Sequence, residues 1–122
     1  MAQVNGIVIS IRAEHADEFE RLFLAEELPI WQRLAAETGQ LQYASLTRVR
    51  FGTEQAEGVV RYLIVADFRS MAGHSAHDDD PAFNAFLAKA RLFQPEPPRV
   101  LGGDSVARYP DEPAPGGGGA SG

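Results

Sequence analysis

Residues 59–68 read VVRYLIVADF, and this stretch decides the fold class of the 122-residue chain. Its β-branched and aromatic residues are typical of a β-strand. Both faces of the strand are apolar, with Val59, Leu63 and Val65 on one and Val60, Ile64, Ala66 and Phe68 on the other. A strand of this kind needs a covering layer on each side of its sheet.

The residues before this strand predict two further strands and a helix. Residues 4–12 alternate isoleucines with other residues as a strand does, and residues 43–51 form a second such run. Between them, residues 14–39 carry apolar side chains at helical spacing and end at a glycine. Pro29 lacks a backbone donor, so we expect a kink or break there that could open one end of a pocket.

The residues after it predict two helices and a last strand. Ser70 is a suitable N-cap for a short helix through His77, and Asp80 followed by Pro81 begins the next helix. Three prolines after residue 94 end that helix. Residues 99–109 then supply a fourth strand, with Gly102 and Gly103 as an expected bulge.

The resulting order is βαββαβ, an α+β fold of the ferredoxin-like type. Residues 52–58 form a short glycine-bounded loop, so the strands on either side pair as an antiparallel hairpin in a four-stranded antiparallel sheet. We expect one domain over residues 1–110 and a flexible Gly/Pro-rich tail over 111–122. With both helices on one face of the sheet, a second copy is the simplest cover for the other face, which predicts a homodimer.

Composition narrows the choice of partners. The net charge of −6 disfavours nucleic acid, which requires a basic surface. The chain has no cysteine, which excludes disulfides and thiolate chemistry. The N-terminus has no signal-peptide pattern, and no run of about 18 apolar residues occurs, so we expect a cytoplasmic protein without a membrane partner.

Two segments resemble a known family. Residues 67–86, DFRSMAGHSAHDDDPAFNAF, and residues 35–49, AAETGQLQYASLTRV, are similar to stretches of the antibiotic-biosynthesis-monooxygenase-like group of the dimeric α+β barrel superfamily. The resemblance implies a dimeric barrel with a small-molecule pocket. Members of that superfamily include oxygenases that use neither metal nor flavin, isomerases, cyclases and haem-degrading enzymes.

The haem-degrading branch fits this chain poorly. That branch, by resemblance, uses an Asn on its first strand, a Trp at the end of its third and a His on its last helix. Asn5 matches the first, whereas Phe68 and Phe86 stand at the other two places. We therefore expect no cofactor.

His74 and His77 are the candidate catalytic residues. They share one face of the predicted helix, and Asp78 follows directly. This set could be a solvated helix end, a pocket acid or base, or a metal site, since imidazoles and a carboxylate bind divalent metals. Because Asp80 already serves as an N-cap, we expect no metal. His77 matches a histidine of the resembled stretch and titrates near neutrality, which suits proton transfer.

Four aromatic residues are candidates for substrate binding. Trp31 follows the Pro29 break and could stack a planar ligand, or belong to the core or the dimer interface. Tyr43 and Tyr62, on adjacent strands, could hydrogen-bond a substrate carbonyl or serve in packing. Phe68, at the end of its strand, completes the set.

The sequence thus leads to an enzyme hypothesis. We expect a small cofactor-independent oxidoreductase, similar to a monooxygenase, that acts on a planar or aromatic metabolite with His77 transferring a proton. Two alternatives stay open: a non-catalytic dimeric small-molecule-binding or scaffold protein, and an isomerase or cyclase on the same fold.

Overall fold

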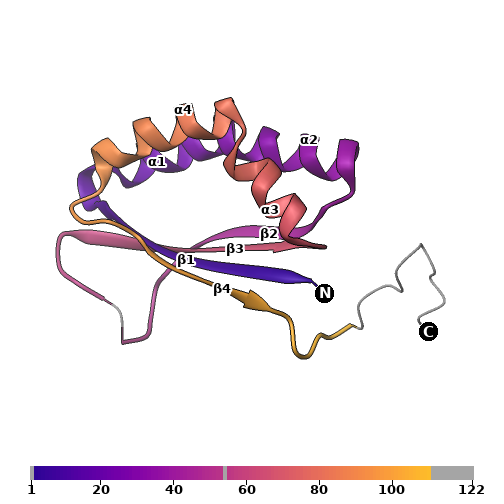
Figure 1. Cartoon of the computed structure of the whole chain (residues 1–122). Helices are drawn as coiled ribbons and strands as arrows, with labels where there is room; N and C mark the ends of the chain where they lie inside the picture. Colours follow the sequence, from indigo (N-terminus) through magenta and orange to yellow (C-terminus); the bar gives the residue numbers. More distant parts are fainter. Residues whose placement is uncertain (1, 54, 111–122) are drawn as a thin grey trace.

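The computed structural model describes residues 2–53 and 55–110 and confirms the predicted α+β fold. The sheet has the antiparallel order β2-β3-β1-β4, and the helices cover one of its faces (Figure 1). The strands are β1 Gln3–Arg12, β2 Leu41–Arg48, β3 Val59–Phe68 and β4 Arg99–Asp104. The helical elements are η1 Ala13–His15, α1 Ala16–Leu22, η2 Phe23–Glu27, α2 Leu28–Thr38, α3 Met71–Asp78, α4 Pro81–Ala90 and η3 Arg91–Phe93. The tail predicted for residues 111–122 lies outside the described residues.

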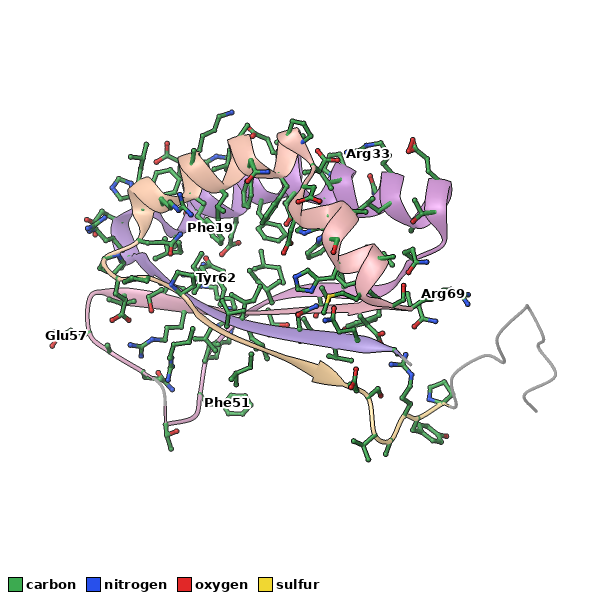
Figure 2. The ribbon with its side chains drawn as sticks, viewed as in Figure 1. Phe19, Arg33, Phe51, Glu57, Tyr62 and Arg69 are labelled. Atoms are coloured by element: carbon green, nitrogen blue, oxygen red, sulfur yellow. The ribbon has the colours of Figure 1, made fainter. Side chains whose placement is uncertain are left out.

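The two central strands match the prediction closely, and the outer strands do not. β2 starts at Leu41, two residues after the left-handed Gly39, and ends at Arg48; both ends come earlier than expected. The predicted continuation includes Phe51, whose side chain is 86% exposed. Figure 2 shows this side chain on the side of the sheet away from the helices.

The bulge predicted in β4 is wrong. β4 pairs with β1 in unbroken register from Arg99 to Asp104, and one further backbone bond, from the Ser105 N–H to the Ala2 carbonyl at 2.9 Å, follows the last pair. Gly102 has a different role, which depends on its neighbour in β1. A Cβ on Gly102 would lie 2.7 Å from the side-chain oxygen of Asn5, so a larger residue at this position would require the Asn5 side chain to move.

Pro29 does not break the first helical region, which runs from Ala16 to Thr38. Instead, the turn before it, η2, is a π-helix, in which the Leu28 N–H donates to the Phe23 carbonyl. Proline cannot donate the backbone bond that an α-helix needs at its position, and a local π-turn absorbs this mismatch. The expected irregularity is therefore a widened turn within a continuous helical rod.

Asp80 begins α4 as predicted. Its Oδ1 accepts a hydrogen bond from the Ala82 N–H at 2.8 Å, and Pro81 occupies the first turn of the helix. Arg33 of α2 forms an ion pair with the other oxygen of this carboxylate and lowers the pKa of Asp80. The start of α4 is therefore tied to α2.

The core lies between the helices and the sheet. Phe19 and Tyr62 are fully buried and point toward one another from α1 and β3 (Figure 2), with ring centroids 5.0 Å apart. Phe23 continues the cluster, with edge-on contacts to Phe19, Trp31 and Phe86. These aromatic rings hold the helical layer on the sheet.

The other face of the sheet carries an apolar patch that no helix of the described residues covers. The register places Val8, Leu63, Val65 and Leu101 side by side on this face. Leu101 is 79% exposed and Leu63 is 38% exposed. Within residues 2–53 and 55–110, no helix combines the length and apolarity that crossing a membrane requires.

Candidate functional site

A cavity of about 430 Å³ lies between the helices and the sheet. Its walls are mostly apolar and aromatic, and they come from β1, β3 and β4 below and from every α-helix above. Apolar lining residues include Ile7, Ile9, Phe19, Phe23, Trp31, Ile64, Phe83, Phe86, Leu87 and Val100. Its volume is within the range of small-molecule sites, and a planar ligand is the shape that aromatic walls favour.

Glu27 brings a carboxylate into this apolar cavity. Phe19, Phe23, Glu27 and Trp31 are spaced four residues apart, and all four line the cavity. In a regular α-helix each step of four overshoots a full turn by about 40°, which would carry Trp31 roughly 120° away from Phe19. The π-turn at Phe23–Glu27 widens the helix and keeps the four side chains on one side. Pro29 thus helps to aim Glu27 into the cavity.

The carboxylate of Glu27 meets His77 from α3. His77 Nε2 lies 3.0 Å from Glu27 Oε2 and 3.1 Å from Oε1. The two residues are only 4% and 9% exposed, and the ring of Phe83 lies against the imidazole with centroids 4.1 Å apart. A buried carboxylate–imidazole pair therefore forms part of the cavity wall.

The pair continues toward the surface through Asp78. His77 Nδ1 lies 3.1 Å from Asp78 Oδ1, and His74 Nε2 lies 2.7 Å from Asp78 Oδ2. His74 Nδ1 in turn contacts Gln3 Oε1 of β1 at 2.8 Å. The Asp78 side chain is 50% exposed, so the chain of polar contacts runs from the buried Glu27 to solvent.

The protonation of His77 follows from its two neighbours. Ionised carboxylates only accept hydrogen bonds, so an imidazole between two of them must be protonated on both nitrogens. Burial alone would lower the pKa of His77, but the hydrogen bonds and charges of Glu27 and Asp78 raise it above its usual value. Burial also raises the pKa of Glu27, although His77 opposes that change. The pair therefore retains protons more strongly than isolated groups would.

These shifts predict that folding stability falls as pH rises. A group whose pKa is higher in the folded chain stabilises it fully below the unfolded pKa, and this stabilisation is lost as pH rises through the folded pKa. For Glu27 the decline begins near pH 4.5, and for His77 near pH 6.5. Urea unfolding at a series of pH values should show both declines. His77→Gln should remove the decline in stability above pH 6.5. A wild-type protein whose stability rises above pH 6.5 would contradict the raised pKa of His77.

The structure brings together four of the six predicted site residues. His74, His77, Trp31 and Phe68 all line the cavity. Trp31 also packs edge-on against Phe23, with ring centroids 5.2 Å apart, so it serves the core and the cavity wall together.

Tyr62 and Tyr43 lie elsewhere. Tyr62 is completely buried in the core, where its hydroxyl donates to Glu20 Oε2 at 2.5 Å and burial raises its pKa. Tyr43 is 57% exposed and pairs in register with Asp67, whose side chain is on the open face of the sheet. Neither tyrosine lines the cavity. Strand alternation places Tyr43 on the open face of the sheet, whereas Tyr62 lies on the helix side, where it packs against Phe19.

The sequence interpretation missed Glu27. A glutamate in an amphipathic helix is usually on the solvated side, and its pairing with His77 joins residues fifty positions apart. The available signal was the four-residue spacing of Phe19, Phe23, Glu27 and Trp31 ahead of a proline. That spacing departs from the helical period and indicates a local irregularity.

The described residues offer no second reactive centre in the other hollow or in a metal-binding cluster. A more polar hollow of about 310 Å³ lies at the β2–β3 hairpin, where Arg48 and Arg61 already pair with Glu20 and Glu96. Among the described residues, no group of three or more His, Asp or Glu side chains is arranged to hold a metal ion. The Glu27–His77 pair is therefore the candidate reactive centre.

Several solved structures of proteins named as antibiotic biosynthesis monooxygenases, most of them provisionally, share this fold. A protein from Caulobacter crescentus, provisionally named as such an enzyme, is 21% identical, with a TM-score of 0.68 over 87% of this chain and 91% of that one. A second provisionally named protein, from Nitrosomonas europaea, is 10% identical, with a TM-score of 0.69 over 91% and 94% of the two chains.

A third neighbour is described as a cofactor-independent oxygenase. SnoaB from Streptomyces nogalater, solved as a mutant, is 14% identical, with a TM-score of 0.65 over 90% of this chain and 98% of that one. No protein-family model and no curated protein sequence matches this chain. The predicted resemblance is confirmed as a likeness of fold, which at these identities establishes the fold alone.

Proposed function

We propose that this chain is a small cofactor-independent monooxygenase that oxidises a planar, electron-rich aromatic metabolite. The observation that carries the proposal is the buried Glu27–His77 pair in the wall of an apolar cavity of about 430 Å³. A buried carboxylate with a raised pKa in an apolar cavity is suited to removing a weakly acidic proton. The fold that this chain shares with a described cofactor-independent oxygenase supports the choice of reaction.

The proposed reaction can be written for anthrone, a planar ketone with an acidic methylene group. Glu27 takes one methylene proton, and the resulting carbanion passes electrons to O₂ as a carbon–oxygen bond forms. The proton returns to the peroxide, giving a hydroperoxide. Loss of the second methylene proton then breaks the O–O bond, forms the carbonyl and releases water. Anthrone and O₂ give anthraquinone and water, so substrate and oxygen supply every atom and electron.

We assign the proton acceptor to Glu27 and a supporting role to His77. The sequence had suggested His77 itself as the transferring group. Because two carboxylates favour the doubly protonated imidazole, His77 has no free nitrogen to accept a proton. Its positive charge instead orients Glu27 and stabilises the substrate anion, as a fixed donor does in a site from which water is excluded.

We further propose that the chain forms a homodimer through the open face of its sheet. Val8, Leu63, Val65 and Leu101 form an apolar patch there, and no helix of the described residues covers it. A symmetric dimer would bury this patch against itself. Sedimentation equilibrium should give twice the chain mass, and Leu63→Lys should shift the chain toward monomer; a monomeric wild type would contradict this.

An oxygen electrode tests the proposed reaction with anthrone. We expect the protein to consume one O₂ for each anthraquinone formed, at a rate well above that of buffer alone and unaffected by EDTA. Quinone formation without protein-dependent O₂ uptake would contradict the proposal. Anthrone binding without any oxidation would instead favour the small-molecule-binding alternative, and turnover of a substrate without O₂ would favour an isomerase or cyclase.

A further inference from the structure

The cavity has a second polar end, far from Glu27 and His77. Arg91 and Gln94, at the C-terminal end of α4 and in the turn after it, both line the cavity. α4 runs along the cavity, since its residues from Phe83 to Ala90 contribute to the same wall. Phe83 is against the His77 ring, and Arg91 follows it by eight residues, which is about 12 Å along a helix.

The side-chain amide of Gln94 has a hydrogen-bond donor that is unpaired within the described residues. Its side-chain Nε2 is buried and has no hydrogen-bond partner there. Leaving a buried amide donor unpaired costs free energy, so such groups in proteins usually meet a ligand or water. Because Gln94 lines the cavity, a ligand in the cavity is the natural acceptor.

Arg91 adds a positive charge beside this donor. Its guanidinium has no hydrogen-bond or ion-pair partner among residues 2–53 and 55–110, in contrast to Arg33, Arg48 and Arg61. The acidic residues that line the cavity, Glu27 and Asp78, are both at the histidine end. The charge distribution therefore favours a ligand that places a negative group at Arg91 and a neutral, acidic group at Glu27.

We propose that Arg91 and Gln94 form a subsite for a carboxylate, and that the ligand is an elongated aromatic hydroxy acid. The guanidinium and the amide would donate to the carboxylate oxygens, and the aromatic body would lie between the Phe and Trp side chains. The position of the hydroxyl at Glu27 rests on the proposed function, whereas the carboxylate subsite does not.

Calorimetric titration with two matched probes tests the subsite. The probes are 6-hydroxy-2-naphthoate and 2-naphthol, which share a ring system and a hydroxyl but differ in the carboxylate. We expect the wild type to bind the naphthoate at least about tenfold more tightly, because a charge-assisted hydrogen bond is among the strongest polar contacts. Equal affinity for the two probes, or no binding of either, would overturn the proposal.

Three variants test whether Arg91 and Gln94 cause the preference for the naphthoate. Arg91→Gln should abolish most of the preference for the naphthoate and leave 2-naphthol binding unchanged, and Gln94→Leu should reduce the preference by a smaller factor. Lys89→Gln removes a positive charge from the same helix, where it pairs with Glu26 at 2.6 Å without lining the cavity, and should keep the full preference. An unchanged preference in Arg91→Gln, or an equal loss in Lys89→Gln, would overturn the subsite.

The readout separates this inference from the proposed function. Probe affinity needs neither oxygen nor turnover, so a protein that fails to oxidise anthrone can still show the carboxylate preference. Conversely, anthrone carries no carboxylate, so its oxidation can proceed if the subsite is absent. Urea midpoints equal to that of the wild type should accompany all three variants, since Arg91 is exposed and the Gln94 side chain makes no hydrogen bond to the described residues.

Discussion

Glu27→Gln is expected to lower the rate of anthrone oxidation by about 10²–10⁴-fold, the usual contribution of a positioned general base. Glutamine has nearly the same shape as glutamate but cannot accept the substrate proton. The loss should appear in kcat, measured with an oxygen electrode, because the substitution leaves the apolar walls that bind the ring unchanged. The melting temperature should change little, since burial penalises the carboxylate that is removed.

Glu26→Gln is the matched control for this variant. Glu26 is the adjacent residue in the same π-turn, but it pairs with Lys89 and does not line the cavity. The same chemical change at Glu26 should therefore leave the rate within about twofold of the wild type, as expected for a surface pair of small energetic value. A Glu27→Gln variant with wild-type rate would remove this carboxylate from the mechanism. Equal losses in both variants would indicate an effect on the helix.

Phe19→Ala is expected to reduce the free energy of unfolding by about 3–5 kcal/mol, as for other buried Phe-to-Ala substitutions. Phe19 is fully buried and joins α1 to the sheet through its contact with Tyr62. A loss of this size is a large part of the roughly 5–15 kcal/mol that stabilises a typical domain. Urea unfolding followed by Trp31 fluorescence measures it directly, because Trp31 is the single tryptophan of the chain.

Two further variants make this result interpretable. Phe19→Leu keeps most of the apolar volume and should cost less than Phe19→Ala, which gives a measurable value if the alanine variant is too unstable to purify. Leu92→Ala removes a similar apolar group from a position that is 75% exposed and should change stability by no more than about 0.5 kcal/mol. All variants should be compared at one protein concentration, because dimerisation would make stability concentration-dependent. A loss under about 1 kcal/mol in Phe19→Ala would show that α1 is held mainly by other contacts.

Much of the fold could be predicted because its signals are local. Residues 59–68 have the composition of a strand and an apolar side on each face, and β3 has those bounds in the structure. Asp80 followed by Pro81 is a capping signal that depends on a few adjacent residues, and α4 begins there. Likewise, His77 and Trp31 could be chosen as site candidates from their chemistry and their positions beside helix signals.

The sequence by itself therefore determined the α+β topology, the Asp80 cap of α4 and the two-sided apolar strands. Ser70 stands before α3 as predicted, but its hydroxyl bonds Gln40 Oε1 and does not cap the helix. Only the tertiary structure decided that Glu27 meets His77 across fifty residues, that the Gln94 Nε2 is buried without a partner among the described residues, and that neither Tyr43 nor Tyr62 lines the cavity. It also replaced the expected β4 bulge with a close approach between Gly102 and Asn5. The physical reason is the distance along the chain over which each interaction acts. Periodicity and capping act over a few neighbouring residues, whereas the site depends on how the π-turn rotates one helix and on how that helix packs against another.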